Sequence, residues 1–147
     1  NCSNNYGPNQ HEEKLIPLTI KNVIERKKIP IYGDGKAVRD WMFVLDHVDA
    51  IDCIFHKGCK NQTYNVGASN ELKNIELVSL ICDLIDNKLG TKNSKDLIEL
   101  VSDRPGHDKR YAIDASKIIN ELKWRPRTKF SKGLNVTIEW YLNKLIK

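Results

Sequence analysis

The sequence alternates between short β-prone runs and longer segments in which apolar residues recur at helical spacing. Apolar side chains return every three or four positions across residues 15–28 and 74–85, as they do on the buried face of a helix. Residues 29–32 and 97–101 are short, apolar and rich in β-branched side chains, which is typical of strands. Because strands alternate with helices, we expect an α/β fold.

Turn-forming residues and helix-start signals divide the rest of the chain. Gly33-Asp34-Gly35 predicts a tight turn, and alternating side chains after it predict a second strand through Leu45. The other expected elements are a helix over 46–55 with Val48, Ile51, Ile54 and Phe55 on one side, a strand over 62–66, a helix capped by Asn74 with a buried stripe of Leu77, Val78, Ile81, Leu84 and Ile85, a short helix from Asp114 to Leu122, and a final helix capped by Ser131 with a stripe of Leu134, Ile138, Tyr141 and Leu145.

Length and composition are those of one globular domain. The chain has 147 residues, of which 40% are hydrophobic and 29% charged, and this is enough for a single core. No apolar run approaches the roughly 20 residues that a membrane span requires, so we expect a soluble protein. The four cysteines form no Cys-x-x-Cys pair and have no histidine at zinc-ligand spacing, so we predict reduced thiols and no metal site.

The net charge of +5 comes largely from basic residues between Arg104 and Lys132. A nucleic-acid surface is one interpretation, but few aromatic residues are interleaved and no binding motif is present. A solvated face with a few phosphate-binding arginines is the favoured alternative. The Gly33-Asp34-Gly35 turn is not a dinucleotide fingerprint, because Val38 occupies the third glycine position and a strand follows it.

Two segments carry candidate binding residues. The loop over 103–108 presents Arg104 and His107 beside two aspartates, and a guanidinium can bind phosphate oxygens in a bidentate manner. A turn closed by a surface salt bridge explains the same residues equally well. Arg39 is followed by Asp40, and a structural ion pair is the commoner outcome for such a pair. Taken singly, these residues leave both alternatives open.

The order and spacing of seven runs resemble those of one family. The runs are SNNYGP at 3–8, EKLIPL at 13–18, IPIYGDG at 29–35, RDWMFVLDH at 39–47, TYNVG at 63–67, DRPGHDKRYAID at 103–114 and KWRPRTKF at 123–130. Together they resemble the carboxy-terminal part of the dTDP-glucose 4,6-dehydratases, which are extended short-chain dehydrogenase/reductases. The resemblance implies that residues 1–147 form a small mixed α/β nucleotide-sugar-binding domain that lacks most of the Rossmann half.

The resemblance also implies which residues bind ligands. The residues expected to line the dTDP-sugar pocket are Asn4, Lys14, Leu15, Pro30, Ile31, Tyr32, Arg39, Asn74, Asp103, Arg104, Pro105, Gly106 and His107. Asn5 is expected to contact NAD, most of which the absent amino-terminal half would bind. The two arginines of this set suit the diphosphate, and the backbone at 14–15 and 30–32 can frame thymine. Asn74, at a helix start, can offer its side-chain amide and backbone donors.

In such an enzyme, dTDP-glucose is converted to dTDP-4-keto-6-deoxyglucose with NAD, in a cytoplasmic homodimer with no nucleic-acid or membrane partner. The family's catalytic Tyr-x-x-x-Lys and its acidic pair precede the part of the family that residues 1–147 resemble. The match from Tyr32 to Lys36 spans a glycine turn, whereas the family's pair needs one helical turn. We therefore expect no catalytic residue in this chain, which alone should be inactive and bind nucleotide sugar weakly. A fragment of a related UDP-sugar epimerase or decarboxylase, and a phosphate- or nucleic-acid-binding module, are the alternatives.

Overall fold

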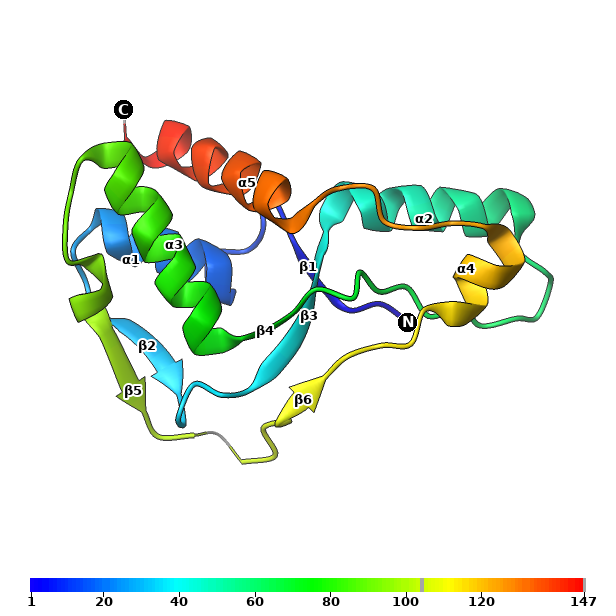
Figure 1. Ribbon diagram of the computed structural model, residues 1–147, viewed down its shortest axis with the longest axis horizontal. Coiled ribbons are helices and arrows are strands. Elements are labelled where there is room, and N and C mark those ends of the chain that lie inside the picture. The colour runs from blue at the N-terminus through cyan, green and yellow to red at the C-terminus, as the bar shows by residue number, and fades with distance from the viewer. Residues whose placement is uncertain (104, 147) are drawn as a thin grey trace.

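Short strands and longer helices alternate along the chain in the computed structural model, which describes residues 1–103 and 105–146 (Figure 1). The predicted mixed α/β class is confirmed. The elements are β1 (Asn4–Tyr6), α1 (Leu15–Ile24), β2 (Ile29–Tyr32), β3 (Val38–Phe43), α2 (Val44–Lys57), β4 (Glu71–Lys73), α3 (Asn74–Leu89), a 3-10 turn (Ser94–Leu97), β5 (Ile98–Val101), β6 (Arg110–Tyr111), α4 (Ser116–Leu122) and α5 (Phe130–Leu145).

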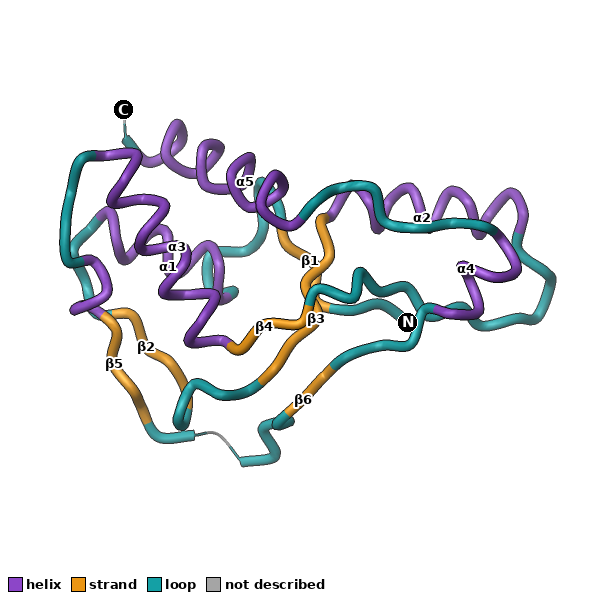
Figure 2. Tube along the Cα trace, in the orientation of Figure 1, coloured by secondary structure: helices purple, strands orange, loops and turns teal. Residues whose placement is uncertain are grey.

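The strand β3 is the centre of the larger sheet. It pairs in parallel with β1 and β6 and antiparallel with β4. A separate sheet of two parallel strands joins β2 to β5, with Tyr32 opposite Val101. The predicted turn at Gly33–Gly35 is present, but β2 and β3 on either side of it belong to different sheets (Figure 2). The two sheets therefore diverge after this turn, and a space is left between them.

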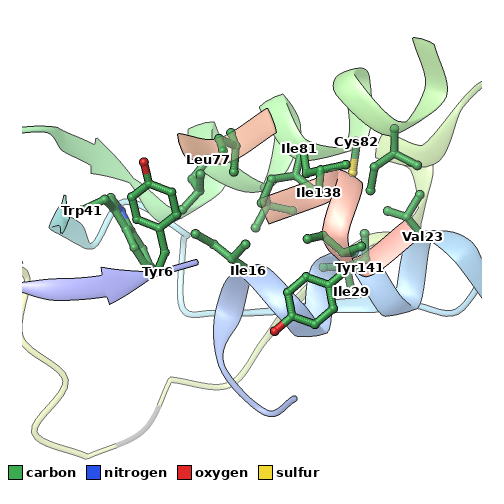
Figure 3. Packing of buried hydrophobic residues seen from close by; sticks show 14 of the residues in the cluster. Tyr6, Ile16, Val23, Ile29, Trp41, Leu77, Ile81, Cys82, Ile138 and Tyr141 are labelled. Carbon is green, nitrogen blue, oxygen red and sulfur yellow. The ribbon is translucent and has the colours of Figure 1, made fainter. Parts of the chain in front are cut away.

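Most of the core lies between α1, α3, α5 and the strands β1 to β3 (Figure 3). The apolar stripe predicted for residues 77–85 is buried against α1 and α5, as expected. A second, smaller cluster joins the far side of β3 to α2 and α4. The fully or nearly buried residues of this second cluster are Met42, Ala50, Tyr64, Val66, Ala115, Ile118 and Trp124.

Several predicted boundaries are wrong for local reasons. The helix expected to reach Lys28 ends at Ile24, because Arg26 adopts a left-handed φ of 54° and cannot continue it. The strand expected over 62–66 is reduced to a single bridge between Cys2 and Val66. The strands β4 and β6 are too short to produce a sequence pattern. The N-cap positions are Lys73, Ala115 and Lys129, each one or two residues from the predicted caps.

The helix α2 is longer than predicted and its apolar side faces outward. Leu45, Val48, Ile51 and Phe55 are all exposed, the last by 83%. Spaced three or four residues apart, they form one stripe along the helix. Burial in α2 is instead on the side of Ala50, so the apolar side predicted for this helix is present but is largely exposed in the chain.

No helix in the described residues is long and apolar enough to cross a membrane. All four cysteines are free thiols.

Candidate functional site

A cleft of about 320 Å³ lies between the two sheets and the starts of α1 and α3. The residues that line it are Asn4, Glu13, Lys14, Leu15, Leu18, Pro30, Ile31, Tyr32, Arg39, Trp41, Asn74 and His107. Nine of the residues predicted from the sequence are in this group. Segments far apart in the sequence therefore converge on one cavity, which is the organisation expected of a ligand site.

Strand register explains the convergence. Arg39 and Trp41 are two residues apart on β3, so both side chains lie on the same face of the strand. Asn4 pairs with Trp41 across β1 and β3. On the other wall, the end of β2 lies beside the end of β5, which leads into the loop that carries His107. The parallel pairing of β1 with β3 and of β2 with β5 thus brings residues of β1 and β3, the end of β2 and the loop after β5 together at the cleft.

Arg39 is buried in the cleft without a carboxylate partner. Only 8% of the residue is exposed, and its Nη1 donates to the carbonyl oxygen of Val38 at 2.7 Å. Asp40 is not its partner, since that carboxylate accepts from the backbone N–H groups of Ala68 and Asn70 at 3.0 and 2.7 Å. No ion pair to Arg39 exists within residues 1–103 and 105–146. A buried, unpaired guanidinium favours an anionic ligand.

Asn74 contributes its side chain to the cleft but not its backbone. Its N–H donates to the carbonyl of Ala37 and the next N–H, of Ile75, donates to that of Gly35, both at 3.0 Å. The turn after β2 thus occupies the first backbone donors of α3, and the prediction that they are available to a ligand is wrong. The side-chain Oδ1 is buried with no partner in the described structure.

Among the described residues of the loop over 103–108, His107 lines the cleft. The His107 ring is 6% exposed, its Nδ1 lies 2.7 Å from Asp103 Oδ1, and it meets the ring of Tyr32 edge-on at 6.5 Å between centroids. Asp103 lines a neighbouring cavity of about 460 Å³ that shares Tyr32 and His107 with the cleft. Pro105 and Gly106 are exposed and line neither cavity, and Arg104 lies outside the described residues.

Asn5, predicted to contact a cofactor, lies on β1 outside the cleft lining. Its Nδ2 donates to the carbonyl of Ser3 at 3.1 Å, and its Oδ1 is buried with no partner in the described part of the chain. This oxygen can accept a hydrogen bond from a ligand amide.

Three lining residues were not predicted. Glu13 and Leu18 flank the run that supplies Lys14 and Leu15, and Leu18 follows Leu15 by one helical turn. Trp41 shares the face of β3 with Arg39. For Leu18 and Trp41, the periodicity of the helix or strand that holds a predicted residue points to its neighbour, whereas Glu13 precedes the helix and is not indicated by periodicity.

A family model described as GDP-mannose 4,6 dehydratase matches residues 1–137. The chain belongs to this family. It is 52% identical over 143 residues to a dTDP-glucose 4,6-dehydratase of Shigella flexneri, a match that covers 97% of this chain and 40% of that protein. The resemblance found in the sequence is thereby confirmed.

Comparison with solved structures leads to the same family. A dTDP-glucose 4,6-dehydratase from Bacillus anthracis, in complex with NAD, is 50% identical with a TM-score of 0.86, over 97% of this chain and 43% of that one. The Streptomyces venezuelae enzyme, also with NAD bound, is 40% identical with a TM-score of 0.88, over 97% and 42%. The chain therefore spans about two fifths of the length of the relatives it matches.

Proposed function

We propose that residues 1–147 form the nucleotide-sugar-binding part of a dTDP-glucose 4,6-dehydratase. The complete protein would be an NAD-dependent lyase that converts dTDP-glucose to dTDP-4-keto-6-deoxyglucose. The relatives that match nearly the whole chain at about half identity carry this name. A cytoplasmic homodimer belongs to the same proposal and rests on the resemblance.

The observation that carries the proposal is the buried guanidinium of Arg39. Without an anion its burial is costly, since an uncompensated charge loses its hydration. A diphosphate supplies charge and several acceptor oxygens, and guanidinium groups bind such oxygens through charge-assisted hydrogen bonds. The side chains of Asn4 and Asn74 lie on the same cleft and can donate further hydrogen bonds. Arg39 therefore anchors the diphosphate in this proposal.

The other end of the cleft suits a base. The start of α1 at Lys14 and Leu15 faces the segment from Pro30 to Tyr32 across the cavity. The N–H of Lys14 donates to the carbonyl of His11 at 3.0 Å, but the N–H of Leu15, the first residue of the helix, has no partner within the helix and can bind a pyrimidine carbonyl. The Leu15 and Pro30 side chains offer apolar contact to the ring faces. These features fit thymine next to the diphosphate.

Asn5 fits the expected contact to NAD. Its buried, unpartnered Oδ1 can accept a hydrogen bond from the carboxamide of a nicotinamide ring. When bound, NAD supplies reversible hydride transfer at the sugar's fourth carbon. The present residues would orient the sugar nucleotide beside it. The segment Tyr32–Lys36 runs through a turn and not a helix, so it does not form the family's Tyr-x-x-x-Lys pair.

Titration of the complete protein with dTDP, UDP and a DNA oligomer tests the proposal. We expect dTDP to bind more tightly than UDP, and we expect the DNA oligomer not to bind. A nucleic-acid-binding module would instead bind the oligomer with a steep salt dependence. Arg39→Ala should weaken dTDP binding by about 1.5–3 kcal/mol, as for a lost charge-assisted contact. Arg125→Ala is the matched control, because it removes the same charge from an exposed position away from the cleft. Preference for UDP, or an unchanged affinity in Arg39→Ala, contradicts the assignment.

A further inference from the structure

Trp41 lines the cleft with a buried polar group that has no partner. The residue is 4% exposed, and its indole Nε1 has no hydrogen-bond partner in the described residues. Tyr6 lies beside it in Figure 3, but the Tyr6 hydroxyl donates to the carbonyl of Phe130 at 3.3 Å. A buried N–H without an acceptor is unfavourable, and such groups are rare in native proteins.

Another tryptophan shows how the fold satisfies an indole that has a purely structural role. Trp124 is buried to the same extent, also 4% exposed, and its Nε1 donates to Asp49 Oδ2 at 2.9 Å. This tryptophan joins α2 to the chain after α4, far from the cleft lining. Within the part of the chain that the structure describes, the indole of Trp124 thus has an acceptor, whereas that of Trp41 at the cleft has none.

The neighbours of Trp41 indicate the missing acceptor. An indole N–H can only donate, so its partner must offer a lone pair. Trp41 follows Arg39 on the same face of β3, about 7 Å along the strand, and Asn4 is its partner in register. An acceptor that also satisfies the unpaired charge of Arg39 is an anion with several oxygens spread over a few ångströms.

We propose that the Trp41 indole N–H donates a hydrogen bond to a diphosphate oxygen of the bound nucleotide, next to the oxygens held by Arg39. The inference rests on the proposed function, because it takes the diphosphate as the occupant of the cleft. It makes Trp41 a ligand-binding residue, and the part of it that binds is a single N–H.

Phenylalanine keeps an aromatic ring and removes that N–H. In the complete protein, Trp41→Phe should raise the Kd for dTDP about tenfold, as expected for a lost hydrogen bond to a charged acceptor. Trp41→Phe and Trp124→Phe both lose buried volume, but only Trp124→Phe also loses an internal hydrogen bond. Without ligand, the Tm of Trp41→Phe should therefore fall less than that of Trp124→Phe, which is the matched control and should leave the Kd unchanged. Calorimetric titration and thermal unfolding measure the two quantities.

Two results overturn the inference alone. One is an unchanged Kd for dTDP in Trp41→Phe, which would mean that water or nothing meets the indole. The other is a weaker Kd accompanied by a fall in Tm as large as that of Trp124→Phe, which would mean that the ring is structural. If the unmodified protein does not bind dTDP, the proposed function fails as well, so the two failures are distinguishable.

Discussion

Arg110 binds Glu71 across the central strand through two hydrogen bonds of 2.7 Å, from Nε to Oε2 and from Nη2 to Oε1. The pair joins β6 to β4, which flank β3 on the same sheet. With only two residues, β6 offers few backbone contacts of its own. The pair therefore helps to fix the end of the loop that carries His107 into the cleft.

Glu71→Gln should loosen this loop. We expect dTDP affinity in the complete protein to fall about two- to fivefold, while Tm changes little, because a solvent-exposed ion pair contributes little to stability. Glu139→Gln, which breaks the Lys88–Glu139 pair at 2.7 Å on α5, is the control and should leave affinity unchanged. Equal affinities in both variants would show that the pair does not position the loop.

The same pair gives a pH dependence. The hydrogen bond from Arg110 lowers the pKa of Glu71 below its ordinary value. A carboxyl group with a lowered folded-state pKa stabilises the fold above its unfolded pKa, and this contribution is lost as pH falls through the folded pKa. The affinity difference between unmodified protein and Glu71→Gln should therefore hold at neutral pH and vanish on acidification below the usual range of glutamate. A difference that persists in acid would contradict this.

His107 and His56 form a natural comparison. Each lies four residues after an aspartate that its Nδ1 contacts, at 2.7 Å for Asp103 and 3.4 Å for Asp52. The His107 side chain is 6% exposed at the cleft, whereas that of His56 is 62% exposed on α2. His107→Ala should weaken dTDP binding several-fold, since a polar side chain that lines the cleft is removed. His56→Ala should leave binding and turnover unchanged, and a large loss there would show that the cleft is not the ligand site.

The sequence predicts those elements whose pattern is complete within the chain. The stripe of α3 is buried as expected, and the predicted strand β2 is present with Ile29 and Ile31 buried, because both elements pack on others that this chain supplies. The stripe of α2 from Leu45 to Phe55 is exposed. Periodicity identifies an apolar face but does not say which element covers it.

The site was predicted largely by resemblance, and its finer features depend on tertiary contacts. A sequence does not reveal that the turn after Gly35 takes the backbone donors of Asn74, or that Asp40 turns away from Arg39 to hold Ala68 and Asn70. Both arrangements are hydrogen bonds between segments that are distant in the sequence. They determine which backbone and side-chain groups remain available to a ligand.

Asp46 supports the loop before α5. It is 7% exposed and accepts from the backbone N–H groups of Arg127 and Thr128, at 3.2 and 3.0 Å, and from the Thr128 hydroxyl at 3.2 Å. Asp46→Asn replaces one acceptor oxygen by a donor that faces N–H groups, so the free energy of unfolding should fall by about 1–3 kcal/mol. Urea unfolding measures it, with the exposed Asp52→Asn on the same helix as control. A change below 0.5 kcal/mol, roughly the range of ordinary surface substitutions, would exclude this role.

Gly133 allows α5 to approach β1 and β3. A Cβ at this position would lie 2.9 Å from Cδ2 of Phe43 and would also meet the hydroxyl oxygen of Tyr6. Tyr6 cannot retreat easily, because it is 1% exposed and packs on the rings of Phe43 and Phe130. The close contact therefore has to be relieved by a shift of the whole helix.

Gly133→Ala should consequently destabilise the protein although alanine is the better helix former. Helix propensity alone predicts a gain of about 1 kcal/mol, while overpacking a filled core typically costs about 1–3 kcal/mol. We expect a net loss in urea unfolding, whereas Lys132→Ala, exposed on the preceding position of the same helix, should change stability little. A more stable Gly133→Ala variant would show that α5 and β3 are not held at this distance, since only a looser contact leaves room for the added methyl group.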